Sequence, residues 1–170
     1  MFIAIDAQYG EDKAAKVAAV LFEGWSSNPA RQEWVIEVAN VAEYEPGAFY
    51  KRELPCITAI LDLISDPLGC IIVDGYVDLG VGKPGLGRHL FEYLDGKVPV
   101  VGVAKSFFPG TDAEEVLRGV SARPLFVTAA GISAPEAALG VRQMAGRHRL
   151  PALLQRVDHL ARGIVTPKVD

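Results

Sequence analysis

The sequence contains little cysteine and little histidine, and neither residue follows a metal-binding pattern. Its 170 residues include two Cys and three His, with no CxxC, HExxH or HxH spacing of the kind that binds zinc. Cys56 and Cys70 lie in apolar stretches, so we expect reduced core thiols in place of a disulfide. The absence of a GxSxG motif argues against a serine hydrolase of the α/β-hydrolase type.

The sequence also lacks a long apolar run. The longest nearly unbroken one, at 98–104, is far shorter than the roughly 18–20 residues that a membrane-spanning helix needs. The N-terminal stretch reaches Asp6 after Met1 and four further apolar residues, whereas the apolar region of a secretory signal spans about 7–15 residues. We therefore expect a soluble, cytoplasmic protein.

The residues that are present fit one globular domain. Half of them are hydrophobic and 22% are charged, and chains of about 100–200 residues usually bury a single core. The 17 Gly and 11 Pro are spread along the chain without a repeat, which excludes a collagen-like or linker-like protein. We expect a single domain over residues 1–170.

The net charge of −4 is unevenly distributed along the chain. Residues 1–80 contain five Lys and Arg against 13 Asp and Glu, whereas residues 141–170 contain six against two. An acidic cluster that binds a cation, next to a basic surface that binds an anionic polymer, would give this pattern. Scattered solvated charges would give it too, so net charge alone leaves both interpretations open.

Hydrophobic periodicity predicts an α/β fold. Strands are expected at 2–6, 16–22, 33–41, 70–74 and 98–104, with 123–128 as a further candidate. Helices are expected at 49–64, 86–94, 134–147 and 151–163. The order βββαβαβα predicts a mixed sheet with flanking helices, in which an antiparallel meander is followed by parallel, right-handed crossovers.

Acidic residues end two of the expected strands. If the fourth strand lies beside the first, Asp6 and Asp74 meet at the edge where open α/β sheets bind ligands. Two neighbouring carboxylates repel unless a cation lies between them, and hard oxygen ligands suit Mg²⁺ or Mn²⁺. Glu53 on the intervening helix could supply a third ligand. Because strand-terminal Asp residues also cap turns, the spacing alone leaves both roles open.

Two further basic segments are candidates for contacts with phosphate. Lys105 follows the strand at 98–104 on the same expected edge, where it could neutralise a phosphate or a leaving oxygen. The glycine-rich segment 80–87 does not match the P-loop motif GxxxxGK[ST], since Pro84 follows Lys83. We expect it to be a flexible loop in which Gly82 and Lys83 contact a nucleic-acid backbone.

Six segments give the sequence a family resemblance that covers nearly the whole chain. They are Ile5-Asp6-Ala-Gln-Tyr9, Tyr44-Glu-Pro-Gly-Ala-Phe-Tyr-Lys-Arg-Glu53, Val73-Asp-Gly75, Gly85-Leu-Gly-Arg-His89, Val101-Gly-Val-Ala-Lys-Ser106 and Arg149-Leu-Pro151. In this order and spacing they resemble endonuclease V, a family that cleaves DNA or RNA near deaminated purines such as inosine. The resemblance implies a ribonuclease H-like fold and a role in nucleic-acid repair.

The resemblance also implies roles for individual residues. By it, Asp6, Glu53 and Asp74 correspond to the acids that bind Mg²⁺, for which Mn²⁺ can substitute, and Lys105 corresponds to the active-site lysine. Acids with a divalent cation can activate water and stabilise the transition state of phosphodiester hydrolysis. The implied activity is a metal-dependent endonuclease.

The expected partner is DNA or RNA that contains deaminated purines. Tyr44 and Pro46 correspond to the family's strand-separating wedge beside the lesion pocket. Loop glycines such as Gly75 would let the backbone approach the edge of a hypoxanthine base.

The sequence departs from the family pattern at several positions. Gly80 and Gly131 stand where two family histidines are expected, and Glu45 adds a negative charge to the wedge. Asp78 could replace a missing histidine as ligand or base, or it could simply occupy a turn. Three interpretations therefore remain: an endonuclease of reduced activity, a catalytically impaired nucleic-acid-binding module that retains the fold and part of the metal site, or a protein that binds other partners.

Overall fold

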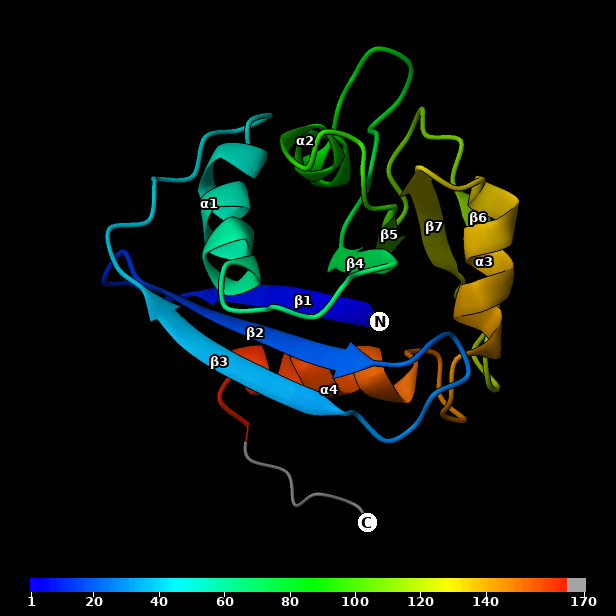
Figure 1. Ribbon diagram of the computed structural model, residues 1–170. Helices are drawn as coiled ribbons and strands as arrows, with labels where there is room; N and C mark the ends of the chain where they lie inside the picture. The colour runs from blue at the N-terminus through cyan, green and yellow to red at the C-terminus, as the bar shows by residue number, and fades with distance from the viewer. Residues whose placement is uncertain (165–170) are drawn as a thin grey trace.

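Within residues 1–164, which the computed structural model describes, seven strands form one mixed β-sheet with helices on both faces (Figure 1). The strands are β1 (Phe2–Tyr9), β2 (Ala15–Phe22), β3 (Gln32–Val38), β4 (Cys70–Asp74), β5 (Val100–Ala104), β6 (Glu114–Val116) and β7 (Leu125–Ala130). The helices are α1 (Tyr50–Leu61), α2 (Leu86–Tyr93), α3 (Ala134–Gln143) and α4 (Ala152–Ala161). The last six residues of the basic stretch 141–170 lie outside the described part.

The strand order across the sheet is β3-β2-β1-β4-β5-β7-β6. The first three strands form the expected antiparallel meander, and the expected neighbours β1 and β4 pair in parallel. β4 and β5 also pair in parallel, with α2 between them in the chain. The carboxyl ends of β1, β4 and β5 therefore lie at one edge of the sheet, which we call the carboxyl edge.

The last part of the sheet differs from the predicted element order. β7 pairs antiparallel to β5, so it is not a further parallel crossover strand, and the sequence prediction omitted β6. Parallel pairing needs a crossover connection, which is usually a helix, and the chain between β5 and β7 contains no helix. β6 is three residues long and two of them are Glu, so it has no apolar alternation that a sequence pattern could detect.

Several element ends also differ from the prediction. α1 continues through Pro55 but ends at Leu61, and β3 ends at Val38. α3 begins after Ser133, whose hydroxyl accepts the Glu136 N–H as the capping-box spelling predicts. It ends at Gln143, four residues earlier than expected. Beyond this end, the Arg118 guanidinium donates hydrogen bonds to the carbonyls of the following residues, including Ala145 and Gly146.

Two apolar layers hold the helices on the sheet. α1 and α2 pack on one face through residues such as Ile57, Ile60 and Leu90, and α3 and α4 pack on the other through Val141 and Val157. The two layers follow from the alternation of side chains along each strand. The cysteines are buried free thiols, as expected. Among residues 1–164, no helix is long and apolar enough to cross a membrane.

Candidate active site at the carboxyl edge of the sheet

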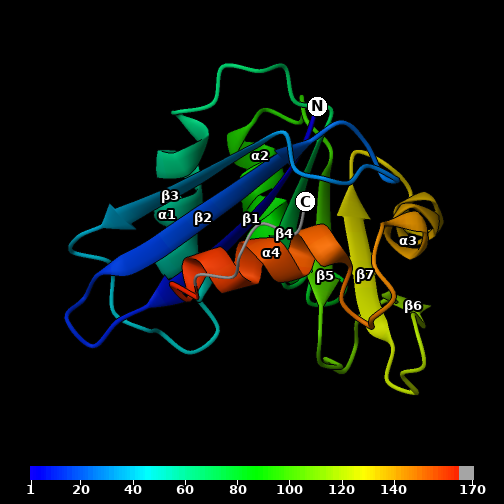
Figure 2. The same ribbon diagram turned by 90° about the horizontal axis from the view of Figure 1, so that it is seen from below.

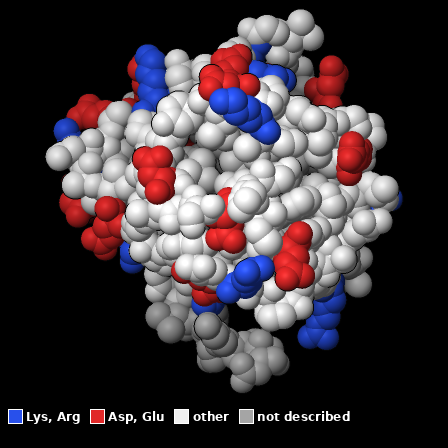
Figure 3. Space-filling model, viewed as in Figure 1, with Lys and Arg blue, Asp and Glu red and all other residues white. Residues whose placement is uncertain are grey.

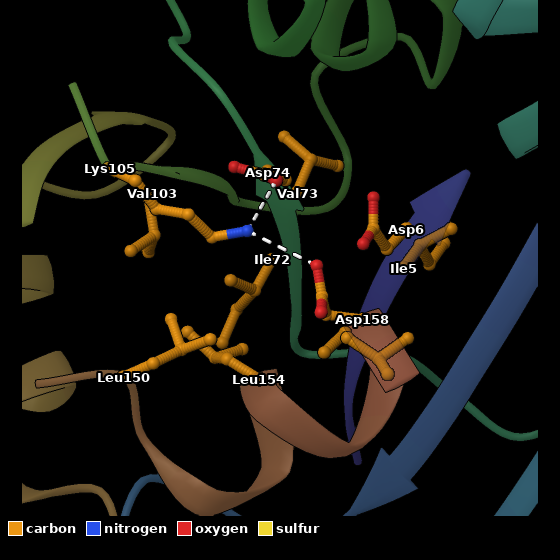
Figure 4. A pocket seen from close by; sticks show the side chains of 12 residues that line it. Ile5, Asp6, Ile72, Val73, Asp74, Val103, Lys105, Leu150, Leu154 and Asp158 are labelled. Atoms are coloured by element: carbon orange, nitrogen blue, oxygen red, sulfur yellow. Dashed lines mark hydrogen bonds and ion pairs between the residues drawn. The ribbon is translucent and has the colours of Figure 1, made fainter. Parts of the chain in front are cut away.

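The parallel pairing of β1 and β4 brings two acidic residues together. Ile5 is in register with Val73, so Asp6 and Asp74 follow at equivalent positions on neighbouring strands. Both side chains line one pocket at the carboxyl edge (Figure 4). The arrangement that the sequence predicted for these two residues is therefore present.

Lys105 and a third acid, Asp158, complete this pocket. The Nζ atom of Lys105 lies 3.0 Å from Oδ2 of Asp74 and 3.3 Å from Oδ1 of Asp158, as the dashed lines in Figure 4 mark. Asp158 comes from α4 and is 9% exposed. Its other oxygen, Oδ2, lies 3.0 Å from Nε of Arg162. One ammonium group thus connects two carboxylates from elements that are far apart in the sequence.

Asp158 was not identified from the sequence, although a signal for it exists. Leu154, Val157 and Ala161 are buried on one face of α4, and Asp158 is buried with them. The spacing of these residues is that of the apolar stripe of an amphipathic helix. A carboxylate in such a stripe needs a partner, because a buried unpaired charge is costly.

Asp6 is buried and only half satisfied by hydrogen bonds. It is 5% exposed, and its Oδ1 accepts the backbone N–H of Ala7 at 2.8 Å, whereas its Oδ2 has no hydrogen-bond partner. Burial and the negative charge of Asp74 raise the pKa of Asp6 from 3.8 to about 6, against smaller opposing effects that include Lys105. Without a further cation, the Asp6 carboxylate is only weakly stabilised as an anion.

Glu53 shares this environment from the opposite side. It is 5% exposed in α1, and its Oε2 has no hydrogen-bond partner. Burial and the charges of Asp6 and Asp74 raise the pKa of Glu53 well above its usual value. The fold therefore brings Glu53 within electrostatic range of the two strand-end acids.

The donor set fits a hard divalent cation, although a complete metal cluster is not formed. Among residues 1–164, no three His, Cys, Asp or Glu side chains have an arrangement that could hold a metal ion. Buried carboxylate oxygens normally have a partner, and Asp6 and Glu53 each present one that has none. Carboxylate oxygens are the ligands that Mg²⁺ prefers in proteins. The two orphan oxygens are the candidate ligand atoms for such a cation.

Lys105 is held as a cation by its neighbours. Burial disfavours its charge, but the carboxylates of Asp74, Asp158 and Asp6 together outweigh this effect and raise the pKa of Lys105 above its usual value. Its main chain is fixed as well, because Arg149 donates a hydrogen bond to the Lys105 carbonyl. Lys105 therefore carries a stable, positioned positive charge in the pocket.

The predicted wedge is an exposed aromatic loop beside this edge. Tyr44 is 61% exposed, and its ring centroid lies 6.3 Å from that of Phe49. Pro46 is also exposed. Glu45 forms an ion pair with Lys51 at 3.1 Å, so its charge is partly neutralised and does not stand alone against phosphate.

The glycine-rich loop is more ordered than predicted. Leu79 donates a backbone hydrogen bond to Lys83 at 2.7 Å, and Asp78 forms a two-point ion pair with Arg88 at 2.7 and 3.1 Å. Gly82 and Lys83 are exposed at the tip of this turn. Asp78 does not line the pocket of Asp6 and Asp74, and its carboxylate is paired with Arg88.

The backbone conformation at Gly80 and Gly131, the positions of the two expected family histidines, favours glycine. Gly80 has φ +132°, and an added Cβ would lie 2.9 Å from the Gly110 carbonyl oxygen. Gly131 has φ +83°, and an added Cβ would lie 2.9 Å from the ring of Phe91. Both positions leave no room for a larger side chain in this backbone.

The mixed sheet, its helical layers and the acidic carboxyl edge place the protein in the ribonuclease H-like class of α/β folds. A family model described as Endonuclease V matches residues 1–132. Endonuclease V from Streptomyces avermitilis is 30% identical over 93% of this chain and 77% of its own length. Endonuclease V from Rhodospirillum centenum is 29% identical over 91% of this chain and 73% of its own length. The chain belongs to the endonuclease V family, a family of nucleases.

Solved structures agree with this assignment. The crystal structure of the Streptomyces avermitilis endonuclease V has a TM-score of 0.77 at 26% identity, over 95% of this chain and 79% of that one. Endonuclease V of Ciona intestinalis, crystallised with a 23mer DNA that contains an inosine, has a TM-score of 0.80 over 95% of this chain and 83% of that one. At 16% identity, the second likeness concerns the fold alone.

Proposed function

We propose that this protein is a divalent-cation-dependent endonuclease that hydrolyses a phosphodiester bond near inosine in DNA or RNA, in the service of nucleic-acid repair. The observation that carries the proposal is the convergence of Asp6, Asp74 and Asp158 around Lys105 at the carboxyl edge. Family membership supports the reaction class. The inosine-containing DNA bound by the Ciona intestinalis relative supports the choice of lesion.

The metal ligands follow from the distribution of acids. Asp6, Glu53 and Asp74 would hold Mg²⁺, or Mn²⁺ in its place, with Asp158 as a further candidate ligand. The bound cation would supply an activated water and a positive charge for the phosphate oxygens in the transition state. The two orphan oxygens of Asp6 and Glu53 support this proposal.

The remaining steps depend on side chains of the protein itself. Lys105 keeps its proton because Asp74 raises its pKa, so it presents a fixed positive charge to the phosphate or to the leaving oxygen. Asp74 holds the Lys105 ammonium at 3.0 Å and thereby orients it. Preoriented charges of this kind do not reorganise during the reaction, which makes their stabilisation of the transition state effective.

Recognition of the lesion is assigned to the loops around the carboxyl edge. The exposed ring of Tyr44, followed by Pro46, would separate the strands beside the lesion. Gly75 has φ +125°, and an added Cβ there would meet no atom within 4 Å, which leaves open space for the edge of a base. Gly82 and Lys83 would contact the backbone, where the exposed Lys83 supplies a positive charge.

A second candidate function is a module that binds nucleic acid without cleaving it. The glycines at 80 and 131 favour it, because both lack the imidazole that the family pattern provides at these positions and neither backbone admits one. The two functions share a binding surface and differ in turnover, so one assay separates them.

The assay measures cleavage of three end-labelled substrates, each with a single inosine: a DNA duplex, a DNA single strand and an RNA single strand. Each is incubated with Mg²⁺, Mn²⁺ or EDTA. Product is expected with either metal and not with EDTA, and it should be lost in Asp6→Ala and Asp74→Ala. The matched control is Asp62→Ala, which removes an exposed carboxylate at the end of α1.

Two results would contradict the endonuclease. Product that persists in both Asp6→Ala and Asp74→Ala would exclude the assigned site. Inosine-dependent binding by the wild type without product in any lane would favour the binding module instead.

A further inference from the structure

Two adjacent phenylalanines are exposed beside the candidate active site. They lie in the loop between β5 and β6, where Phe107 is 63% exposed and Phe108 is 43% exposed. We infer that Phe107 and Phe108 form a stacking platform for unpaired bases of the strand that the site binds. This inference rests on the proposed function, because it needs a nucleic acid at the carboxyl edge.

Buried aromatic rings support both phenylalanines from behind. The ring centroid of Phe107 lies 5.7 Å from that of Phe126 in β7, which is 8% exposed. The centroid of Phe108 lies 6.1 Å from that of Tyr76, which is 9% exposed. Each ring is therefore held against the core while a large part of its surface stays open to solvent.

The loop that carries the two rings is fixed by hydrogen bonds. The Tyr76 hydroxyl donates to the carbonyl of Ser106 at 2.6 Å, and the Thr111 hydroxyl donates to the carbonyl of Phe108 at 3.0 Å. An aromatic platform of this kind loses little conformational entropy on binding, because its rings are already positioned.

The platform is close to the reacting groups along the chain. Phe107 is two residues after Lys105, and an extended chain spans at most about 3.3–3.6 Å per residue, or roughly 7 Å here. One DNA strand rises about 3.4 Å per nucleotide. The Cα atom of Phe107 is therefore within about 7 Å of that of Lys105, which puts the platform within reach of nucleotides next to a phosphate held at Lys105. The loop after β3 carries Tyr44, and the loop after β5 carries Phe107. Figure 2 shows both loops at the same edge of the sheet as the end of β1.

The charges near this loop favour contacts with bases over contacts with phosphates. Asp112, Glu114 and Glu115 follow the two rings in the sequence, and the net charge of the chain is −4. On the face seen in Figure 3, Lys and Arg side chains are interspersed with Asp and Glu side chains. Stacking on a ring face needs no positive charge and accepts any base, so it suits an acidic neighbourhood.

The test is a double-mutant cycle in which a ring is removed from the protein and a base is removed from the DNA, with binding affinity as the measurement. Inosine-containing single-stranded DNA is titrated in EDTA, so that binding is measured separately from cleavage. An otherwise identical strand carries an abasic nucleotide, placed in turn at each of three positions on either side of the inosine. At the position that contacts the platform, loss of the base or of the ring in Phe107→Ala should each weaken binding by about 5- to 150-fold.

The two losses should not add at that position, because each removes the same contact. Phe107→Leu keeps an apolar side chain against Phe126 and should still lose the part of the binding affinity that depends on the base. Phe107→Trp keeps an aromatic ring and should retain that part of the affinity. The matched control is Tyr93→Ala, which removes a ring that is 58% exposed at the C-terminal end of α2. It should leave both affinities unchanged.

Additive losses at all six positions, or full affinity in the double variant Phe107→Ala/Phe108→Ala, would overturn the platform. The same holds if the rings prove to contact only a protein partner, since the base-dependent coupling would then be absent. A coupled loss in a protein that shows no cleavage would support the platform and refute the proposed endonuclease. Cleavage in a protein that shows no coupling between ring and base would refute the platform and support the proposed endonuclease.

Discussion

Lys105 and Asp74 form an ion pair across the parallel strands β4 and β5, with Nζ 3.0 Å from Oδ2. The Lys105 ammonium group thus lies at the edge where the acids converge, and its Nζ is also 3.3 Å from Oδ1 of Asp158. Lys105 is therefore both a charge that can stabilise a transition state and the counter-charge of two candidate metal ligands. Removal of the ammonium group should separate these two effects.

We predict that Lys105→Met lowers the single-turnover cleavage rate about 100-fold or more, the usual effect of removing one preoriented donor from a developing oxyanion. In contrast, Mn²⁺ should bind more tightly to the variant, because Asp74 and Asp158 lose a competing cation. Calorimetry with Mn²⁺ and a quenched-flow rate measurement check the two parts. Lys97→Met is the control, since Lys97 is exposed and its ammonium group forms an ion pair with Asp95 at 3.2 Å. Weaker Mn²⁺ binding in Lys105→Met would contradict the prediction.

The raised pKa of Asp6 predicts a pH dependence of stability in the metal-free protein. Folding raises this pKa from 3.8 to about 6, so the folded state binds the proton more tightly than the unfolded state does. The resulting stabilisation is fully present below about pH 4 and is lost as the pH rises through 6. The shift corresponds to a loss of about 3 kcal/mol in the free energy of unfolding.

Asp6→Asn removes this ionisation. In EDTA at pH 7, we expect the variant to be more stable than the wild type by up to about 3 kcal/mol, with a difference that shrinks below pH 4. Urea unfolding at a series of pH values measures it. Millimolar Mn²⁺ should stabilise the wild type more than the variant, because ligand binding to the folded state adds to stability. A variant less stable than the wild type at pH 7 in EDTA would show that the carboxylate has a partner that the structure does not contain.

The sequence predicted the part of the site that depends on strands. Asp6 and Asp74 each end an apolar segment, and parallel pairing of β1 with β4 follows from the order of the elements, so their meeting at one edge was accessible from spacing. Lys105 was accessible for the same reason. Glu53 was only a possible third ligand from its place on the intervening helix, because a position within a helix does not by itself indicate which side chain faces the sheet; the family resemblance then added the metal-binding role.

Asp158 could not be placed from the sequence alone. Its contact with Lys105 joins positions 53 residues apart, and it depends on where α4 crosses the sheet. The candidate strand at 123–128 is present as β7, but its antiparallel direction was not predicted for a similar reason, since strand direction depends on the connection and not on the apolar pattern. The chain after the early end of α3 is held by Arg118, whose guanidinium reaches its carbonyls from a separate loop, and sequence spacing does not reveal such a contact.

Tyr44 should affect duplex substrates more than single strands. Its ring is exposed and packs only against Phe49 among the described aromatic rings, so Tyr44→Ala should leave the free energy of unfolding within about 0.5 kcal/mol of the wild type. If the ring separates strands, the variant should lose cleavage of the inosine duplex and retain most cleavage of the inosine single strand. The ratio of the two kcat/KM values measures this effect, with Tyr93→Ala as the control. An equal loss on both substrates would assign Tyr44 to another role.

Gly80 should not tolerate the histidine that the family pattern places there. Its φ of +132° is strained for any side chain, and an added Cβ would lie 2.9 Å from the Gly110 carbonyl oxygen. We expect Gly80→Ala to lower the free energy of unfolding by more than about 1 kcal/mol, and Gly80→His to lower it at least as much without raising the cleavage rate. Gly24→Ala is the control, since its Cβ would meet nothing within 4 Å and its φ is not positive. A stable Gly80→His variant with faster cleavage would mean that the loop can rearrange, and that the missing imidazole alone limits the activity of this chain.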